Sequence, residues 1–385
     1  MKLQLPRRSS SAALRTLAAA ALLAPAVPAT WSIVAVNTRT GEVCIATATC
    51  LSGVDLQTLT PVLRVGVGGA CAQSVGDSTG FNRMRIWNGL IAGWSPEEIL
   101  AELSTNDGGF QARQYGIVNM ADEPVTFSGT LDGQAYYGVA RVMDDVRYAI
   151  QGNVLAGIQV ITNAEEAFLA TEGDLGQKVM AAMEGARVFG GDGRCSCNES
   201  APTICGCPPP PFEYSAYTAF WVLARIDDVD DDACSAEGCM GGQYFGNLNV
   251  VSTFDGPEPV LLLEEQYGAW RAARSGRVDQ LRTGVTPSAP RLPADGHTEL
   301  TVDVELRDID GVAVPDPTAT LTIARFYPGP QVAKIISVVQ VSPGLFRYTF
   351  RATRHSGVGR WRITAHQGGQ DILLWPELVI PVDPV

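Results

Sequence analysis

The chain has 385 residues, 46% of them hydrophobic, and a formal net charge of −13 at pH 7. So acidic a chain is repelled by nucleic acid and anionic lipid, and its composition argues against both as partners. The length predicts two domains. No apolar run after residue 29 is long enough to span a bilayer, so we expect no membrane insertion.

Residues 1–29 have the organisation of a secretory signal peptide. A basic start precedes the apolar run Leu17–Val27, and Ala29 is a small residue of the kind found before a cleavage site. Cleavage after Ala29 would make Thr30 the first residue, whereas cleavage after Ala26 would leave Thr30 internal. We expect a secreted, periplasmic or cell-surface protein.

All nine cysteines follow Ala29. In an exported protein they predict disulfides, and the odd number leaves at least one free or paired between chains. Cys195–Cys197 and Cys205–Cys207 have an alternative interpretation as a metal knuckle. Their one-residue spacing differs from the two residues usual in zinc ribbons. We therefore favour disulfides and expect no metal and no cofactor.

Hydrophobic periodicity predicts a mixture of strands and helices through residue 274. The first two strands form a hairpin, and Ser95 with Glu98 predicts a capping box at the start of the second helix. The expected strands are Trp31–Val36, Val43–Thr49, Val62–Val67, Tyr115–Met120, Pro124–Ser128, Tyr148–Gln151 and Ala216–Arg225. The expected helices are Gly80–Gly93, one beginning at Ser95, Ala164–Ala170, Leu175–Ala186 and Leu261–Arg274. With little strict β-α alternation, this order favours an α+β fold.

Two segments interrupt this pattern. Residues 195–213 carry four cysteines and a run of prolines, which predicts a cross-linked surface insert. Residues 227–232 contain five aspartates, for which calcium binding is an alternative. Because the spacing of a helix-loop-helix calcium site is absent, we favour an acidic loop pinned by Cys234 and Cys239.

The pattern changes again towards the C-terminus. Residues 275–293 have the composition of a linker. Five short alternating runs then predict an all-β sandwich: Thr298–Leu306, Thr318–Phe326, Ala333–Val339, Leu345–Ala352 and Gly359–Ala365. We expect domains at 30–284 and 285–385 after the signal peptide at 1–29.

The residue inventory restricts the chemistry available to the first domain. The three histidines are His297, His355 and His366, so residues 30–284 contain none. This excludes a histidine-dependent triad or zinc site within that domain. Lys178 is expected on a solvated helix surface. The remaining bases are carboxylates and the α-amine that cleavage would create, whose ordinary pKa is about 8. A threonine at a free N-terminus carries a nucleophile and a base on one residue.

Six segments, in order, resemble the bacterial family called domain of unknown function 1028 over about residues 30–270. They are Thr30–Ala35, the helix pair after Gly80, Gln114–Val118, Phe127–Gly129, Gln151–Gly157 and Gly190–Arg194. That family resembles the N-terminal nucleophile hydrolases, which implies a four-layer αββα sandwich and hydrolysis of an amide. The tail, from Ala294-Asp295-Gly296 through Asp308–Pro315, resembles the immunoglobulin-like repeats of invasins.

The resemblance also implies roles for individual residues. Thr30 would be nucleophile and base, and Asn153 would donate to the oxyanion, although a turn-forming role is an equal alternative. Asp192 and Arg194 would orient the amine or bind substrate, but we favour a structural ion pair between them. Gln73 and Ser32 are further substrate-binding candidates.

We therefore expect an exported amidohydrolase acting on a small amide or peptide-like compound. The alternative is a non-catalytic extracellular binding or adhesion protein built on the same fold, because fold does not fix function. The sequence leaves a homo-oligomer open.

Overall fold

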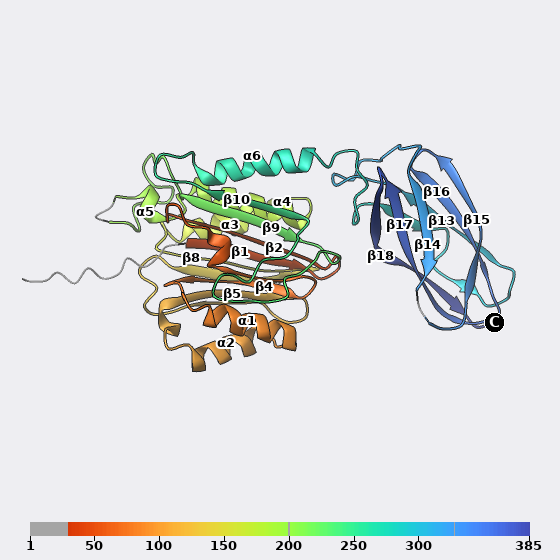
Figure 1. The fold of residues 1–385 in the computed structure, drawn as a ribbon, viewed down its shortest axis with the longest axis horizontal. Coiled ribbons are helices and arrows are strands. Elements are labelled where there is room, and N and C mark those ends of the chain that lie inside the picture. Colours follow the sequence, from red (N-terminus) through yellow and green to blue (C-terminus); the bar gives the residue numbers. More distant parts are fainter. Residues whose placement is uncertain (1–29, 199–200, 327) are drawn as a thin grey trace, which may run out of the picture.

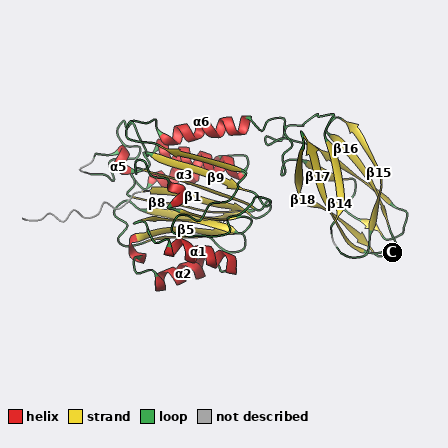
Figure 2. Ribbon diagram, viewed as in Figure 1, coloured by secondary structure: helices red, strands yellow, loops and turns green. Residues whose placement is uncertain are grey.

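The computed structural model of the chain describes residues 30–198, 201–326 and 328–385 (Figure 1). The expected signal peptide at 1–29 lies outside the described residues. The chain has a mixed α/β part followed by an all-β part, and the last helix ends at Ala272 (Figure 2). Among the described residues, no helix has the length and apolar character needed to cross a membrane.

The centre of the first part is a six-stranded sheet with the order β10-β9-β2-β1-β8-β7. The expected hairpin is confirmed, since β1 pairs antiparallel with β2, and β1 also pairs with β8. The strands are β1 (Thr30–Asn37), β2 (Glu42–Thr49), β7 (Tyr137–Met143), β8 (Val146–Asn153), β9 (Thr218–Ala224) and β10 (Gly246–Val251). The sequence patterns missed β7 and β10, which lie at the two edges.

A second sheet packs face to face on the first, in the order β3-β4-β5-β6. Side chains of a strand alternate between its faces, so Val34 and Val36 of β1 point to the second sheet. There they share a buried core with Leu63, Cys71 and Val118. The strands are β3 (Pro61–Arg64), β4 (Gly68–Ser74), β5 (Arg113–Asn119) and β6 (Val125–Ser128).

Helices cover the outer faces of both sheets (Figure 1). Trp31 and Ile33 of β1 point away from the second sheet and pack with α3, α4 and α6. The capping box at Ser95 and Glu98 is confirmed at the start of α2. The helices are α1 (Phe81–Ala92) and α2 (Pro96–Asn106) on the second sheet, and α3 (Gln159–Ala170), α4 (Leu175–Val188) and α6 (Pro259–Ala272) on the first. The remaining helical segments are short: the α-helix α5 (Gly193–Ser196) and the 3-10 helices η1 (Leu56–Thr58) and η2 (Phe110–Ala112).

The all-β part consists of two four-stranded sheets, β11-β13-β16-β15 and β12-β18-β17-β14. Val302, Phe350 and Trp361 are at its core. The strands are β11 (Gly284–Pro287), β12 (Leu292–Pro293), β13 (Glu299–Glu305), β14 (Thr320–Arg325), β15 (Ala333–Ser342), β16 (Leu345–Ala352), β17 (Gly357–Gln367) and β18 (Gln370–Asp383).

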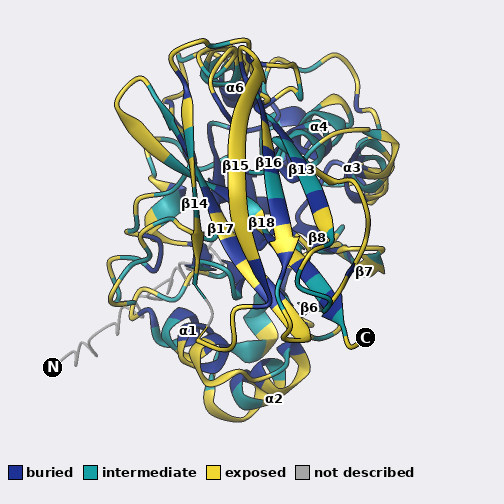
Figure 3. Cartoon of the chain, turned by 90° about the vertical axis from the view of Figure 1, so that its right-hand side faces the viewer, coloured by how far each residue is buried: buried dark blue, intermediate teal, exposed yellow. Residues whose placement is uncertain are grey.

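The expected linker at 275–293 is wrong in part. It contains β11 and β12, and Val278 packs in the core of the all-β part. The prolines of this segment made both strands hard to recognise, since proline is confined to edge strands, strand ends and bulges. Strand β15 is exposed along almost its whole length (Figure 3).

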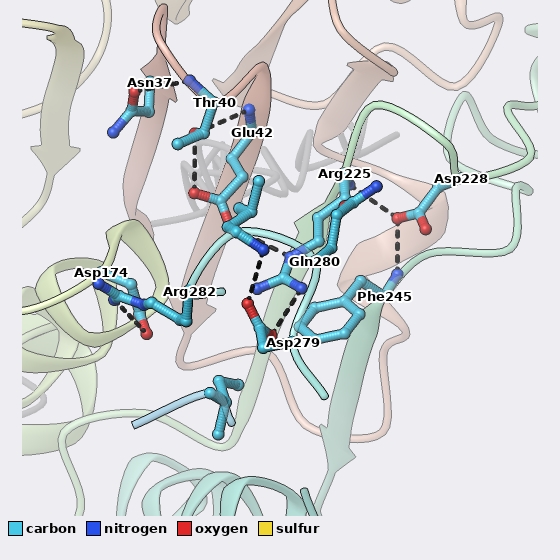
Figure 4. Close-up of polar contacts among 12 residues, drawn as sticks. Asn37, Thr40, Glu42, Asp174, Arg225, Asp228, Phe245, Asp279, Gln280 and Arg282 are labelled. Atoms are coloured by element: carbon cyan, nitrogen blue, oxygen red, sulfur yellow. Dashed lines mark hydrogen bonds and ion pairs between the residues drawn. The ribbon is translucent and has the colours of Figure 1, made fainter. Parts of the chain in front are cut away.

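A buried ionic cluster joins the mixed part to the segment that follows α6 (Figure 4). The guanidinium of Arg225 contacts Glu42 at 3.3 Å and Asp279 at 2.8 Å. It also lies over the ring of Phe245, 3.6 Å from the centroid. Burial raises the pKa of Glu42, while the charge of Arg225 opposes that change. The cluster ties the hairpin end of β2 to residues leading into the all-β part.

Three disulfides confirm the general prediction for the cysteines: Cys50–Cys195, Cys197–Cys205 and Cys234–Cys239. Cys44, Cys71 and Cys207 are free. The metal-knuckle alternative is wrong, because three of its four cysteines are in disulfides. Cys234–Cys239 closes the acidic loop, where Asp228 and Asp231 accept hydrogen bonds from backbone N–H groups and Asp230 pairs with Arg64.

Candidate functional site

Thr30 is the first residue of β1, in the middle of the six-stranded sheet. It is paired in register with Thr49 of β2 and with Asn153 of β8. By alternation, Thr30 and Ser32 point to the same side as Val34, which is the space between the two sheets. Thr30 is 2% exposed, and its Oγ1 donates to Thr49 Oγ1 at 3.3 Å.

Polar side chains replace the apolar inter-sheet core near Thr30. The amide of Gln114 donates to the carbonyl of Gly152 at 2.9 Å, which leaves Gln114 Oε1 as an acceptor. The amide of Gln73 donates to that Oε1 at 2.7 Å and to the carbonyl of Thr30 at 3.1 Å. Gln73 Oε1 is then a buried acceptor with no hydrogen-bond donor among the described residues.

Ser32 belongs to the same polar layer but lies one step further from the end of the sheet. Its hydroxyl accepts a hydrogen bond from Gln151 at 2.6 Å, and both side chains are completely buried. Gln73 therefore contacts Thr30 directly, whereas Ser32 supports the layer behind it.

A cavity of about 180 Å³ opens beside Thr30. It lies at the ends of β1 and β4 and is closed on one side by the segment that contains η1. Its lining is formed by Thr30, Leu51, Leu56, Leu59, Thr60, Ala72, Gln73, Ser74, Gly76, Asp77 and Ser78. Two of the six residues predicted from the sequence, Thr30 and Gln73, are thus at its wall.

Asn153 is next to Thr30, as its strand register requires, but its amide is engaged elsewhere. It donates to the hydroxyl of Ser74 at 3.2 Å and to the carbonyl of Asp132 at 3.4 Å. A direct contact between this amide and a substrate oxygen would require one of these bonds to be exchanged.

Ser74 and Asp132 are site residues that the sequence patterns missed. Ser74 has a φ of 73°, a left-handed conformation that is strained for a residue other than glycine. Asp132 is completely buried, and its Oδ2 accepts from the N–H of Gly129 at 2.6 Å. Burial raises its pKa to about 7, although the Ser74 hydroxyl, the Gly129 N–H and the charge of Arg113 all favour the ionised form.

Asp192 and Arg194 form the expected ion pair, with Arg194 Nη2 2.7 Å from Asp192 Oδ2. Asp192 is fully buried and also accepts from the backbone N–H of Cys50 at 2.7 Å. Arg194 Nη2 donates in addition to Thr49 Oγ1 at 3.2 Å, so the pair reaches Thr30 through Thr49. The Cys50–Cys195 disulfide fastens this arrangement to the end of β2.

The described part of the chain shows no metal centre, and its larger cavities lie away from Thr30. Within the described ranges, no three His, Cys, Asp or Glu side chains are grouped so that they could hold a metal ion. A cavity of about 850 Å³ lies beside Arg225 and Asp279, and none of the six predicted residues lines it.

Comparisons with known proteins found one family and several distantly similar structures. Protein SPO2555 from Silicibacter pomeroyi is 18% identical to this chain, with a TM-score of 0.46. The aligned region covers 63% of this chain and 88% of that protein. Invasin, a bacterial integrin-binding protein, is 11% identical and covers 93% of this chain and 54% of its own, with a TM-score of 0.21. The adhesin InvE of Yersinia pseudotuberculosis is 18% identical over 27% of each chain, with a TM-score of 0.20. No curated protein matches. The model of a family of unknown function, DUF1028, matches residues 30–235, and the chain belongs to that family.

Proposed function

We propose that the protein is an exported amidohydrolase in which Thr30, made N-terminal by removal of residues 1–29, is the nucleophile. The observation that carries this proposal is the position of Thr30. It is the end residue of a central strand, its side chain points between the two sheets, and it lines a cavity. A second support is the absence of histidine from the sequence before His297, which leaves few groups able to act as a base.

The chemistry follows from having both groups on one residue. The α-amine, with an ordinary pKa of about 8, accepts the proton of the Thr30 hydroxyl. The oxygen attacks the amide carbon, and the amine returns the proton to the departing nitrogen. Water then cleaves the acyl ester, which releases the acid and restores the threonine. The Asp192–Arg194 pair would orient Thr30 through Thr49.

The finer fold assignment belongs to the same proposal. Helices on one sheet, two facing sheets and helices on the other sheet are the layers expected of the αββα sandwich of N-terminal nucleophile hydrolases. The three disulfides favour an oxidising compartment outside the cytosol, which suits processing by a signal peptidase. We also propose that the all-β part is an immunoglobulin-like module beginning near residue 285.

A screen of small amides tests the function. The chain starting at Thr30 is expected to hydrolyse at least one of them, and Thr30→Ser to retain part of that rate. Thr30→Ala is expected to lose at least ~100-fold, because the nucleophile is gone. Hydrolysis that is unchanged in Thr30→Ala would refute the proposal. The exposed pair Arg39–Asp145 provides a control, since Arg39→Ala leaves the site untouched.

The alternative, a non-catalytic extracellular binding protein, stays a prediction. The exposed apolar side chains of β15, such as Val338 and Val339, are the observation that favours it. A chain that starts at Thr30, folds normally and hydrolyses no amide in the screen would favour this alternative.

A further inference from the structure

The cavity beside Thr30 is small and mostly apolar. Its volume of about 180 Å³ is below the ~300–1,000 Å³ of pockets for drug-sized ligands, so it suits one small group. Leu51, Leu56, Leu59 and Ala72 supply apolar wall. A group that enters this cavity must therefore be short and largely aliphatic.

The charge of the lining selects against acidic ligands. Asp77 is the charged side chain among the lining residues, and no lysine or arginine is among them. Although burial raises the pKa of Asp77, hydrogen bonds from Thr79 and Asn82 outweigh that effect and lower it. Asp77 is therefore anionic at neutral pH and repels a carboxylate placed in the cavity.

Two polar atoms of the wall complement an amide group. The hydroxyl of Ser74 accepts from Asn153, and its single proton interacts with Asp132, so donation to a ligand carbonyl would replace that interaction. Gln73 is 2% exposed, and its Oε1 has no donor within the described part of the chain. A buried acceptor without a donor is unfavourable, and a ligand N–H would satisfy it once the neighbouring side chains move, because the atom has almost no exposed surface. Ser74 thus offers a donor for the carbonyl of a bound amide, and Gln73 offers an acceptor for its N–H.

The backbone of Ser74 supports a functional role. A non-glycine residue with a φ of 73° has a strained backbone, which persists only where its surroundings hold it. Here Asn153 and the buried Asp132 hold the side chain that faces the cavity.

We propose that this cavity is the acyl subsite of the enzyme: it receives a small uncharged aliphatic group, Ser74 donates to the amide carbonyl, and Gln73 accepts from the amide N–H. The use of the subsite in catalysis rests on the proposed function, but binding to it requires no turnover.

The proposal is tested by measuring how tightly two amino-acid derivatives, each with uncharged ends, bind to the full chain starting at Thr30. We expect acetyl-leucine amide to bind at least ~10-fold more tightly than acetyl-glutamate amide at pH 7.5, measured by NMR titration, because Asp77 repels the glutamate carboxylate. Ser74→Ala is expected to weaken the leucine probe by about 3- to 10-fold, the value of one hydrogen bond. Ser74→Gly removes the hydroxyl and also the backbone strain, so it keeps the test valid if Ser74→Ala folds poorly.

The exposed hydroxyl of Ser104 on α2 gives the matched control, and Ser104→Ala is expected to leave both affinities unchanged. Equal affinity for the two probes, or unchanged leucine-probe affinity in both Ser74 variants, would overturn the subsite. Thr30→Ala separates the two proposals. If Thr30→Ala abolishes hydrolysis but keeps Ser74-dependent binding, both the nucleophile and the subsite are supported. If Thr30→Ala still hydrolyses amides, Thr30 is not the nucleophile, and the subsite then stands or falls on the binding measurements alone.

Discussion

Replacing Asp132 by Asn should change how the stability of the protein depends on pH. Asp132 is completely buried, and burial raises its pKa from 3.8 to about 7 in the folded state. The unfolded chain has the ordinary pKa, so the folded state binds the extra proton between pH 4 and 7. The contribution of Asp132 to stability is therefore fully present below pH 4 and is lost as the pH rises through 7.

The size of the effect follows from the difference between the two pKa values. One pKa unit corresponds to about 1.36 kcal/mol, so the rise from 3.8 to about 7 sets a ceiling of about 4 kcal/mol. The pKa of about 7 already includes the opposing effects of Arg113, Ser74 and the N–H of Gly129. We therefore expect a change of about 3–4 kcal/mol between pH 4 and pH 8.

The assay compares the full chain with the Asp132→Asn variant by urea unfolding from pH 4 to pH 8. Asparagine is uncharged at every pH, so the difference between the two proteins isolates the titration of Asp132. Wild type should lose stability relative to the variant as the pH rises. The exposed Asp144 gives the matched control, Asp144→Asn, which should show no such trend. A difference that stays constant within ~0.5 kcal/mol would refute the argument, because the shift would then be too small to matter.

Three other perturbations follow from the fold and its covalent links. Arg225→Met leaves the buried carboxylates of Glu42 and Asp279 without their cation and should lower the unfolding free energy by about 3–5 kcal/mol. In the same denaturation assay, the control Arg39→Ala, which breaks an exposed pair, should change it by less than ~1 kcal/mol. Cys50→Ser opens the disulfide beside Thr49 and should lower stability by about 2–5 kcal/mol; an unchanged melt would contradict that. Alkylation followed by mass spectrometry should label the half-buried Cys207 in the native protein and all three free cysteines after unfolding, and native labelling of the buried ones would contradict the packing.

Much of the fold could be predicted from local patterns. Alternation located β1 and β2, and the capping box located the start of α2. The same alternation implies that Thr30 and Ser32 face one side of the sheet. The edge strands β7 and β10 escaped notice because half-exposed strands lack a continuous apolar run, and β18 because Pro376 interrupts its pattern.

The candidate site was less accessible from the sequence. Thr30 and Gln73 are 43 residues apart and meet only because the two sheets pack face to face. Nothing in the sequence around Ser74 indicates that its backbone is left-handed. Asp132 precedes Gly133, a pair that is typical of a turn rather than of a buried acid. Contacts of this kind depend on the packing of sheets, which local periodicity does not specify.

The central claim is that a free Thr30 is the reactive group, and covalent labelling of the exported protein tests it most directly. The protein is treated with a small aliphatic β-lactone, which acylates activated hydroxyl groups, and is then analysed by intact and peptide mass spectrometry. We predict a chain that begins at Thr30 and carries one acyl group on that residue. A chain that begins elsewhere, or an unmodified Thr30 with the acyl group on another side chain, would contradict the account.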